Sequence, residues 1–259
     1  MAKLFLIAGP CVVENDAVPF TIAEEVEKIC RRLDIDYIFK ASYKKANRTS
    51  LNSFTGIGDA TALDIIANVG RQVQRPTLTD IHTPGEAEAA AKYVDCLQIP
   101  AFLCRQTDLL LAAGATGKQI NVKKGQFVSP EAMRFPLEKV RSTGNQKVWL
   151  CERGFAFGYE NLIVDATAVA RMKKLGAPVI MDCTHSLQQP NKIEGVSGGN
   201  PELIETIALS AVATGADGLF IEVHPEPSKA LSDGQSMLPL HRLGAILEKV
   251  MKVRQAIYE

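Results

Sequence analysis

The stretch DYIFKA at residues 36–41 is a short run of mostly apolar, β-forming residues that ends near a charged side chain, Lys40. Its apolar residues follow one another without alternation, which is typical of a strand covered on both faces, as in a parallel sheet. Similar runs occur at 3–8, 76–80, 95–99, 119–123, 147–151, 178–182 and 218–223. The sequence therefore predicts eight buried strands.

Amphipathic stretches between these strands predict helices, for example over 20–33, 59–74, 84–92, 129–141 and 201–215. Pro84 stands near a helix start, where its missing N–H is harmless. Gly176 and Gly215 follow helical patterns, where a left-handed cap would fall. Eight strand–helix units of about 32 residues each match a (β/α)8 barrel. No linker or change in composition divides the chain, so we expect one α/β domain, a single (β/α)8 TIM barrel over residues 1–259.

The composition excludes several classes of protein. The 29 Lys and Arg residues balance 29 Asp and Glu residues, and 46% of the chain is hydrophobic, so neither a disordered tail nor a basic nucleic-acid coat is expected. No basic and aromatic residues interleave, so we expect no nucleic-acid partner. No apolar run approaches the roughly 20 residues that span a bilayer, and the apolar start is too short for a signal peptide. Six cysteines without framework spacing predict reduced thiols, a cytoplasmic location and no membrane association.

Polar and ionisable residues close all eight predicted strands, where a purely structural barrel could use Gly, Asn and Ser turns. In a barrel these C-terminal strand ends meet on the face that carries the chemistry. We therefore expect a catalytic site there. The residues at these ends are Cys11, Lys40, Ser42, Asp80, His82, Gln98, Lys123, Lys124, Glu152, Arg153, Asp182, His185, Glu222 and His224.

Basic residues concentrate at this rim although the whole chain is neutral. They are Lys40, Lys44, Lys45, Arg48, Arg105, Lys123, Lys124 and Arg153. A pocket lined in this way would attract anionic small molecules, and Arg forks suit phosphate and carboxylate oxygens. For Lys44 and Lys124, a solvated loop charge is an equally good interpretation.

A metal site is a second possibility. Four possible metal ligands lie at, or shortly after, the ends of the predicted strands that become neighbours when the barrel closes. They are a thiol, an imidazole and two carboxylates, namely Cys11, His185, Glu222 and Asp233. Such groups bind divalent ions when they meet. Spacing alone leaves Asp80, His82 and Asp182 equally eligible, and a cysteine is often an inert core residue.

Two further features have plain structural explanations. The run Ser197-Gly198-Gly199-Asn200-Pro201 opens a predicted helix, where it could bind phosphate through helix N–H groups or form only a turn. His241 lies on a predicted terminal helix with Leu240 and Leu243, and we expect it to be structural.

The chain resembles the 3-deoxy-D-manno-octulosonate 8-phosphate synthases over nearly its whole length. The residues that carry the resemblance are AGPC at 8–11, FKAS at 39–42, KANRTS at 45–50, QIPAFLCRQTDL at 98–109, NVKKGQF at 121–127, ERG at 152–154, FGY at 157–159, DCTHSLQ at 182–188, HPEP at 224–227 and ALSD at 230–233. Each block is modest evidence, but together and in this order they are specific.

The resemblance implies a barrel enzyme, usually tetrameric, that acts in lipopolysaccharide biosynthesis. Such an enzyme condenses phosphoenolpyruvate with D-arabinose 5-phosphate and water. The resemblance also implies roles for named residues. Phosphoenolpyruvate would be held by Lys40, Lys45, Arg105, Lys123 and Arg153, and the sugar phosphate by Asn47, Arg48, Thr49 and Ser50. The pocket would be completed by Ser42, Gln98, Phe102 and Gln188. The expected catalytic residues are Lys40, Lys45, Asp80, Lys123 and His185. Loops 186–200 and 225–237 would then act as lids.

The resembled family has a branch with Cys at the end of the first strand, which requires metal, and a branch with Asn there, which does not. Cys11 and the Asp233 block place this chain with the metal branch by resemblance. We therefore expect one divalent ion, Zn, Fe(II), Mn or Co, on Cys11, His185, Glu222 and Asp233. A thiolate is a strong ligand for such ions, whereas an amide oxygen is a poor one.

Two positions depart from the family pattern. The family usually has Phe-Asp where this chain has Tyr43-Lys44, and Arg where it has Thr55. The alternative function is that of a 3-deoxy-D-arabino-heptulosonate 7-phosphate synthase, which uses erythrose 4-phosphate. Its loop usually reads Lys-Pro-Arg-Thr-Ser, whereas this chain has an Asn, Asn47, before Arg48. A catalytically dead scaffold would predict eroded strand ends, which this sequence does not have.

Overall fold

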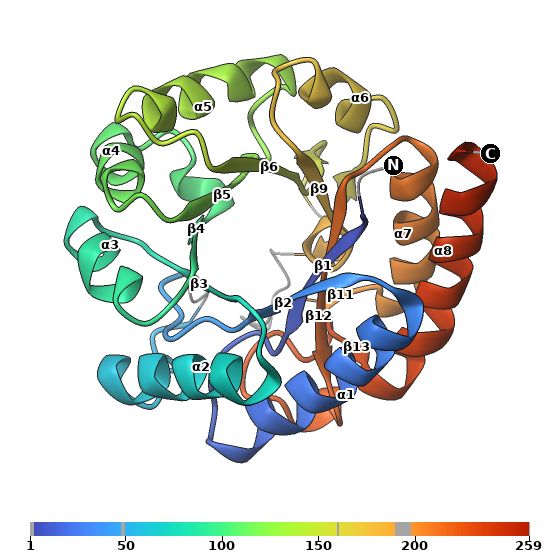
Figure 1. Cartoon of the computed structure of the whole chain (residues 1–259), viewed down its shortest axis with the longest axis horizontal. Helices are drawn as coiled ribbons and strands as arrows, with labels where there is room; N and C mark the ends of the chain where they lie inside the picture. Colours follow the sequence, from blue (N-terminus) through green and yellow to red (C-terminus); the bar gives the residue numbers. More distant parts are fainter. Residues whose placement is uncertain (1–2, 48–49, 160, 190–197, 259) are drawn as a thin grey trace.

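The computed structural model describes residues 3–47, 50–159, 161–189 and 198–258. Eight parallel strands form a barrel that closes where the first strand pairs with the last (Figure 1). They are β1 (Phe5–Gly9), β2 (Asp36–Lys40), β3 (Thr77–Asp80), β4 (Cys96–Ile99), β5 (Gln119–Lys123), β6 (Val148–Glu152), β9 (Val179–Asp182) and β12 (Gly218–His224). All eight predicted strands are present, and the predicted (β/α)8 barrel is confirmed.

The helices of the described chain form a ring outside the barrel, as Figure 1 shows. They are α1 (Ala17–Leu33), α2 (Asp59–Val73), α3 (Pro84–Ala91), α4 (Thr107–Ala115), α5 (Arg134–Arg141), α6 (Ala168–Lys173), α7 (Ile204–Ala213) and α8 (Leu243–Tyr258). Gly176 and Gly215 follow α6 and α7 with φ values of 74° and 88°, so both predicted left-handed positions are confirmed.

Two predicted helices begin later than expected, each after a 3-10 turn. The turn η2 (Glu131–Met133) precedes α5, and η4 (Pro201–Leu203) precedes α7. Pro136 lies in the first turn of α5, where a backbone N–H has no partner within the helix, so it is tolerated. His241 belongs to a separate 3-10 turn, η6 (Leu240–Arg242), directly before α8 rather than to the terminal helix itself.

The glycine-rich run does not open a helix. Gly198 and Gly199 form β11 (Gly198–Gly199), which pairs with β10 (Gln188–Gln189), and the helical turn begins only at Pro201. Ser197 lies outside the described residues. The two glycines therefore belong to a short antiparallel pair of strands, and phosphate binding at a helix N-terminus, one of the two interpretations of this run, is not supported at these glycines.

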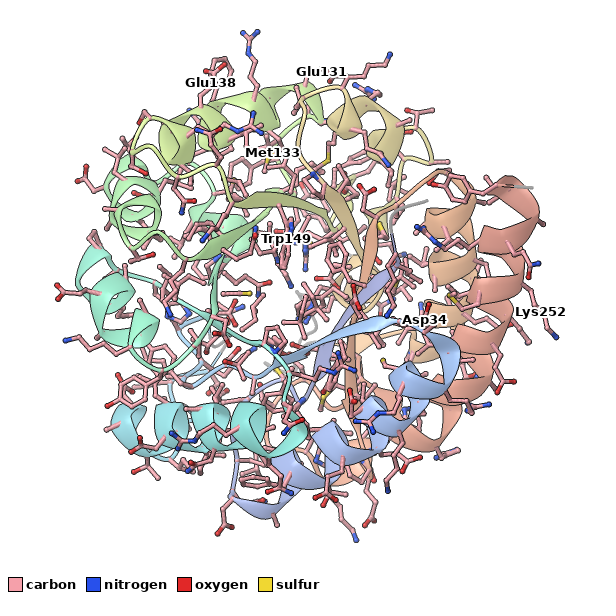
Figure 2. All side chains as sticks on the ribbon, in the orientation of Figure 1. Asp34, Glu131, Met133, Glu138, Trp149 and Lys252 are labelled. Atoms are coloured by element: carbon pink, nitrogen blue, oxygen red, sulfur yellow. The ribbon has the colours of Figure 1, made fainter. Side chains whose placement is uncertain are left out.

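Apolar side chains fill the barrel toward the N-terminal ends of its strands, whereas polar side chains lie at the C-terminal ends. Phe5 and Trp149 stack with ring centroids 4.9 Å apart, and Figure 2 shows Trp149 near the barrel centre, while Glu138 and Lys252 project outward from the helices. The other members of this inner cluster are Ile7, Ile38, Leu78, Cys96, Cys151, Ile180 and Phe220. A larger core fills the layer between strands and helices.

Two predictions from the sequence concern the state of the cysteines and the lack of a membrane-spanning segment. All six cysteines lie among the described residues, and each is free and buried. Within the same residues, no helix combines the length and apolar character required to cross a membrane.

Candidate active site

A cavity of about 460 Å³ opens at the C-terminal ends of the barrel strands. Its lining includes most of the residues predicted for the site, although they come from all parts of the chain. Those predicted residues are Lys40, Ser42, Lys45, Asn47, Asp80, Gln98, Phe102, Lys123, Arg153, His185, Gln188, Glu222 and Asp233. The barrel therefore brings together side chains that are far apart in sequence.

Lys40 lines the cavity and is almost fully buried. It is 2% exposed, its Nζ lies 2.5 Å from Glu222 Oε1, and it donates to the Cys11 carbonyl at 3.0 Å. Burial opposes its charge, but the carboxylates of Glu222 and Asp80 outweigh burial and raise the pKa of Lys40. Lys40 is thus a fixed cation that a substrate anion would meet.

Asp80 is held as a carboxylate by hydrogen bonds from two sides. It accepts from Ser42 Oγ and from Gln98 Nε2, each at 2.5 Å, and Asn121 Nδ2 in turn donates to Gln98 Oε1 at 2.7 Å. Burial opposes ionisation, yet the charges of Lys40 and Lys123 hold the pKa of Asp80 well below its usual range. Asp80 is therefore a hydrogen-bond acceptor in the site at neutral pH, not a proton donor.

Lys123 and His185 share one carboxylate, that of Asp182. Lys123 Nζ lies 2.6 Å from Asp182 Oδ2, and His185 Nδ1 lies 2.9 Å from the same oxygen. Burial opposes its ionisation, but His185 and Lys123 keep the pKa of Asp182 far below its usual range. Because Nδ1 faces Asp182, the other ring nitrogen, Nε2, faces Glu222 Oε2 at 3.5 Å. Asp182 orients the ring in this way and does not line the cavity.

Arg153 offers a free donor to the cavity. One guanidinium nitrogen, Nη2, donates to Gln188 Oε1 at 3.1 Å, whereas Nη1 is buried without a partner among the described residues. Burial lowers the pKa of Arg153 in spite of the nearby Asp182 carboxylate. An unpaired buried guanidinium nitrogen is costly, so a bound anionic group would satisfy it.

The interpretation of Lys124 as a solvated loop charge is wrong. Lys124 is 1% exposed, and its Nζ donates to the carbonyls of Gly125, Val128 and Gly154. Its ammonium also lies 3.4 Å from Glu152 Oε1. Lys124 therefore joins the loop after β5 to the loop after β6 and does not line the cavity.

The four predicted metal ligands form two pairs. Cys11 Sγ lies 3.1 Å from Asp233 Oδ2, and His185 lies beside Glu222, whose Oε2 is buried and has no hydrogen-bond partner among the residues that the structure describes. Lys45 Nζ lies 3.0 Å from both Cys11 Sγ and Asp233 Oδ2. In the described part of the chain, no three His, Cys, Asp or Glu side chains come close enough together to hold an ion. A cation, Lys45, already sits between the members of the first pair.

Two other predicted residues, Ser50 and Arg105, do not line this cavity. Arg48 and Thr49 lie outside the described residues, and Ser50 is exposed and does not line the cavity. Arg105 is also exposed and lines a neighbouring pocket with Phe127, Phe135 and Lys139 instead. The structure thus separates Arg105 from the other predicted phosphoenolpyruvate contacts within one chain.

Sequence reasoning missed Asn121 and Gln126. Asn121 precedes Lys123 by two positions in β5, and residues two apart in a strand share a face, so its inward direction could have been predicted. Gln126 lines the cavity from an irregular loop and has no comparable pattern.

Comparison with known proteins first defines the class. The model of the DAHP synthetase I family matches residues 2–259, and the chain belongs to this family of barrel enzymes. Relatives then narrow the class. A protein of Koribacter versatilis is 53% identical over 98% of this chain and 92% of its own length, and one of Desulfatibacillum aliphaticivorans is 48% identical over 98% and 93%. One of Rhizobium meliloti is 49% identical over 96% and 89%.

All three relatives carry the name 2-dehydro-3-deoxyphosphooctonate aldolase. The chain therefore belongs to the 2-dehydro-3-deoxyphosphooctonate aldolases, which are also called 3-deoxy-D-manno-octulosonate 8-phosphate synthases. The predicted family is confirmed, and the heptulosonate alternative is not favoured.

Proposed function

We propose that the chain condenses phosphoenolpyruvate with D-arabinose 5-phosphate and water, and releases 3-deoxy-D-manno-octulosonate 8-phosphate and inorganic phosphate. This reaction would serve lipopolysaccharide biosynthesis. The observation that carries the proposal is the charge of the cavity. Its described lining holds five cations, Lys40, Lys44, Lys45, Lys123 and Arg153, against three carboxylates, Asp80, Glu222 and Asp233. An excess of cations suits two phosphorylated substrates, one of which is also a carboxylate.

The cations have distinct tasks in this proposal. Lys40, Lys123 and Arg153 are buried and fixed by neighbours, so they hold phosphoenolpyruvate with little loss of side-chain entropy. The free Nη1 of Arg153 supplies a donor for a phosphate or carboxylate oxygen. Lys45 and Asn47 lie on the loop that leads to Arg48, which would bind the sugar phosphate.

The bond changes follow from the substrates. Carbon C3 of phosphoenolpyruvate attacks the sugar aldehyde while water adds at C2, which forms a tetrahedral intermediate. Lys and Arg side chains neutralise the phosphates and the developing alkoxide. The intermediate then loses inorganic phosphate by cleavage of the bond between C2 and oxygen. Asp182 orients His185 so that its Nε2 faces Glu222, the carboxylate with which it would hold the ion proposed below.

Labelled water tests this scheme. When each aldose phosphate is supplied in turn, the enzyme should turn over with arabinose 5-phosphate. In oxygen-labelled water, the label should appear at C2 of the product. Label in the released phosphate would contradict the scheme, and faster turnover with erythrose 4-phosphate would contradict the choice of substrate.

We also propose that one divalent ion, Zn, Fe(II), Mn or Co, binds to Cys11, His185, Glu222 and Asp233. The donor chemistry fits, and the unpartnered Glu222 Oε2 beside His185 is open to a ligand bond. Burial and the Glu222 charge raise the pKa of the Cys11 thiol, so binding of the ion there would release a proton. Such an ion would polarise water or orient a substrate when bound. Lys45 Nζ would have to move from between Cys11 and Asp233.

Further expectations concern the assembly and the cell. We propose a homotetramer located in the cytoplasm, with small phosphorylated molecules as substrates and neither nucleic acid nor membrane as a partner. Exposed Phe127 and Phe135 beside Arg105 favour a contact with another copy there. Mass measurement in solution tests the tetramer, and a monomer would contradict it.

A further inference from the structure

The family departure at Tyr43-Lys44 has a common partner in this chain, Glu86. The Tyr43 hydroxyl donates to Glu86 Oε2 at 2.6 Å, and Lys44 Nζ lies 2.9 Å from Glu86 Oε1. Tyr43 and Lys44 follow β2, whereas Glu86 lies in the first turn of α3, after β3. One carboxylate therefore joins two neighbouring strand-end loops.

Glu86 is also fixed from its own side. Its Oε2 accepts from the His82 backbone N–H at 2.8 Å, and its Oε1 accepts from Thr83 Oγ1 at 3.2 Å. Burial opposes ionisation, but the hydrogen bonds from Tyr43 and Lys44 lower the pKa of Glu86 to about 2. The carboxylate is thus ionised and rigid, and it can hold a loop in place.

The loop that it holds carries the substrate residues. Lys45 comes directly after Lys44, and its backbone N–H donates to the Thr55 carbonyl at 2.8 Å. Lys44, Lys45 and Asn47 all line the cavity, whereas Glu86 does not. A change at Glu86 therefore reaches the cavity through this loop and through His82, which also lines the cavity and whose Nδ1 lies 3.1 Å from Glu86 Oε2.

Lys44 has a second consequence for the charge of the rim. Its ammonium is paired with Glu86 and lies 3.4 Å from Asp59 Oδ2, so its charge is partly neutralised before any substrate binds. Lys44 already lines the cavity, so without Glu86 its ammonium would attract a phosphate there into the wrong position.

We propose that Glu86 is a positioning residue for the sugar-phosphate site, which acts by holding Tyr43 and Lys44 and with them the loop that carries Lys45 and Asn47. This inference rests on the proposed use of an aldose phosphate. In this chain, Glu86 balances the charge that Lys44 brings to a position where the family usually has an acid.

The variant Glu86→Gln tests this, with Glu88→Gln on the same helix as the control. Glu88 is exposed, and its ion pair with Lys92 is long, at 4.0 Å. We expect Glu86→Gln to raise KM for arabinose 5-phosphate about tenfold, because small displacements of binding groups are costly. The value of kcat and the KM for phosphoenolpyruvate should change by less than about twofold. The control should leave all three unchanged.

Two further variants separate positioning from a loss of folding. Tyr43→Phe removes one hydrogen bond to Glu86 and should raise the same KM about threefold, with no change for phosphoenolpyruvate. Lys44→Met combined with Glu86→Gln should cost less than the sum of the two single changes, because they act through one contact.

Three results for Glu86→Gln would overturn the proposal. They are an unchanged KM for arabinose 5-phosphate, an equal rise in KM for both substrates, and a lower KM for arabinose 5-phosphate, which would mean that the freed Lys44 improves binding. A wild-type protein without turnover on arabinose 5-phosphate would instead contradict the proposed function itself, and this inference with it.

Discussion

Lys40 Nζ lies 2.5 Å from Glu222 Oε1, and this buried ion pair joins β2 to β12 across β1, the strand that lies between them. Both side chains are at most 2% exposed. Two buried charges of this kind depend on each other, because removing one leaves the other without its nearest partner. The pair therefore links the cavity's chemistry to the stability of the barrel where it closes.

The variant Lys40→Met should lose both activity and stability. It leaves the Glu222 carboxylate buried without its cation, so we expect the free energy of unfolding to fall by about 3–5 kcal/mol. Urea unfolding followed by circular dichroism measures this. Lys92→Met, at an exposed lysine on the surface, is the control and should have almost no effect. An equally stable Lys40→Met protein would show that the pair is not needed for folding.

The strands and their polar ends could be predicted because each strand is a short local pattern. Lys40, Asp80 and Lys123 all end a buried run, and the barrel rule then brings them to one face. The surroundings of a side chain are not local in this sense. Nothing near Lys124 in the sequence indicates that it donates to Gly154, thirty positions away, rather than to water.

The surroundings of Arg105 and Glu86 could not be predicted from the sequence for the same reason. Arg105 follows β4 and was expected in the pocket, but the 3-10 turn η1 (Ala101–Leu103) intervenes and it points to a neighbouring pocket. Glu86 was not singled out at all, since a Glu near a helix start is ordinary. Its role follows only from the approach of Tyr43 and Lys44, which is a tertiary contact.

The stability of the chain should depend on pH through Glu27, far from the cavity. Glu27 lies on α1 and accepts hydrogen bonds from Arg75 Nε at 2.6 Å and Arg31 Nη2 at 3.0 Å. Burial opposes ionisation, but these two bonds lower the pKa of Glu27 below its ordinary value of 4.5. Its contribution to stability is therefore complete above that value and is lost as the pH falls through the lower folded pKa.

Glu27→Gln should accordingly reduce the free energy of unfolding at about pH 7 by about 1–3 kcal/mol. The difference from the wild type should shrink as the pH falls below the ordinary Glu value. Urea unfolding at several pH values measures it, with the exposed Glu25→Gln as the control. A difference that stays constant over the whole pH range would mean that Glu27 contributes by packing and not by charge.

Arg48 should affect one substrate much more than the other. Its structure lies outside the described residues, so the prediction rests on its place in the block that resembles the family. A guanidinium can contact a dianionic phosphate through two bonds, so Arg48→Ala should weaken arabinose 5-phosphate use by roughly 2–4 kcal/mol. Steady-state kinetics with each substrate varied in turn should show a much smaller change for phosphoenolpyruvate. Equal losses for both would mean that the two pockets are assigned the wrong way round or that the loop has collapsed.

The proposed metal makes the strongest demand on Cys11. Its thiol contacts both Lys45 and Asp233. Because burial keeps the thiol protonated in the absence of an ion, metal binding must release a proton. Chelation should abolish turnover, and an added divalent ion should restore it. Cys11→Ala should lose metal content and activity together, as elemental analysis and an assay of the same sample would show. Cys96→Ala, a buried thiol toward the N-terminal end of the barrel, should keep both. Normal turnover by fully demetallated protein would make Cys11 a core thiol, with Lys45 then the resident cation of the site.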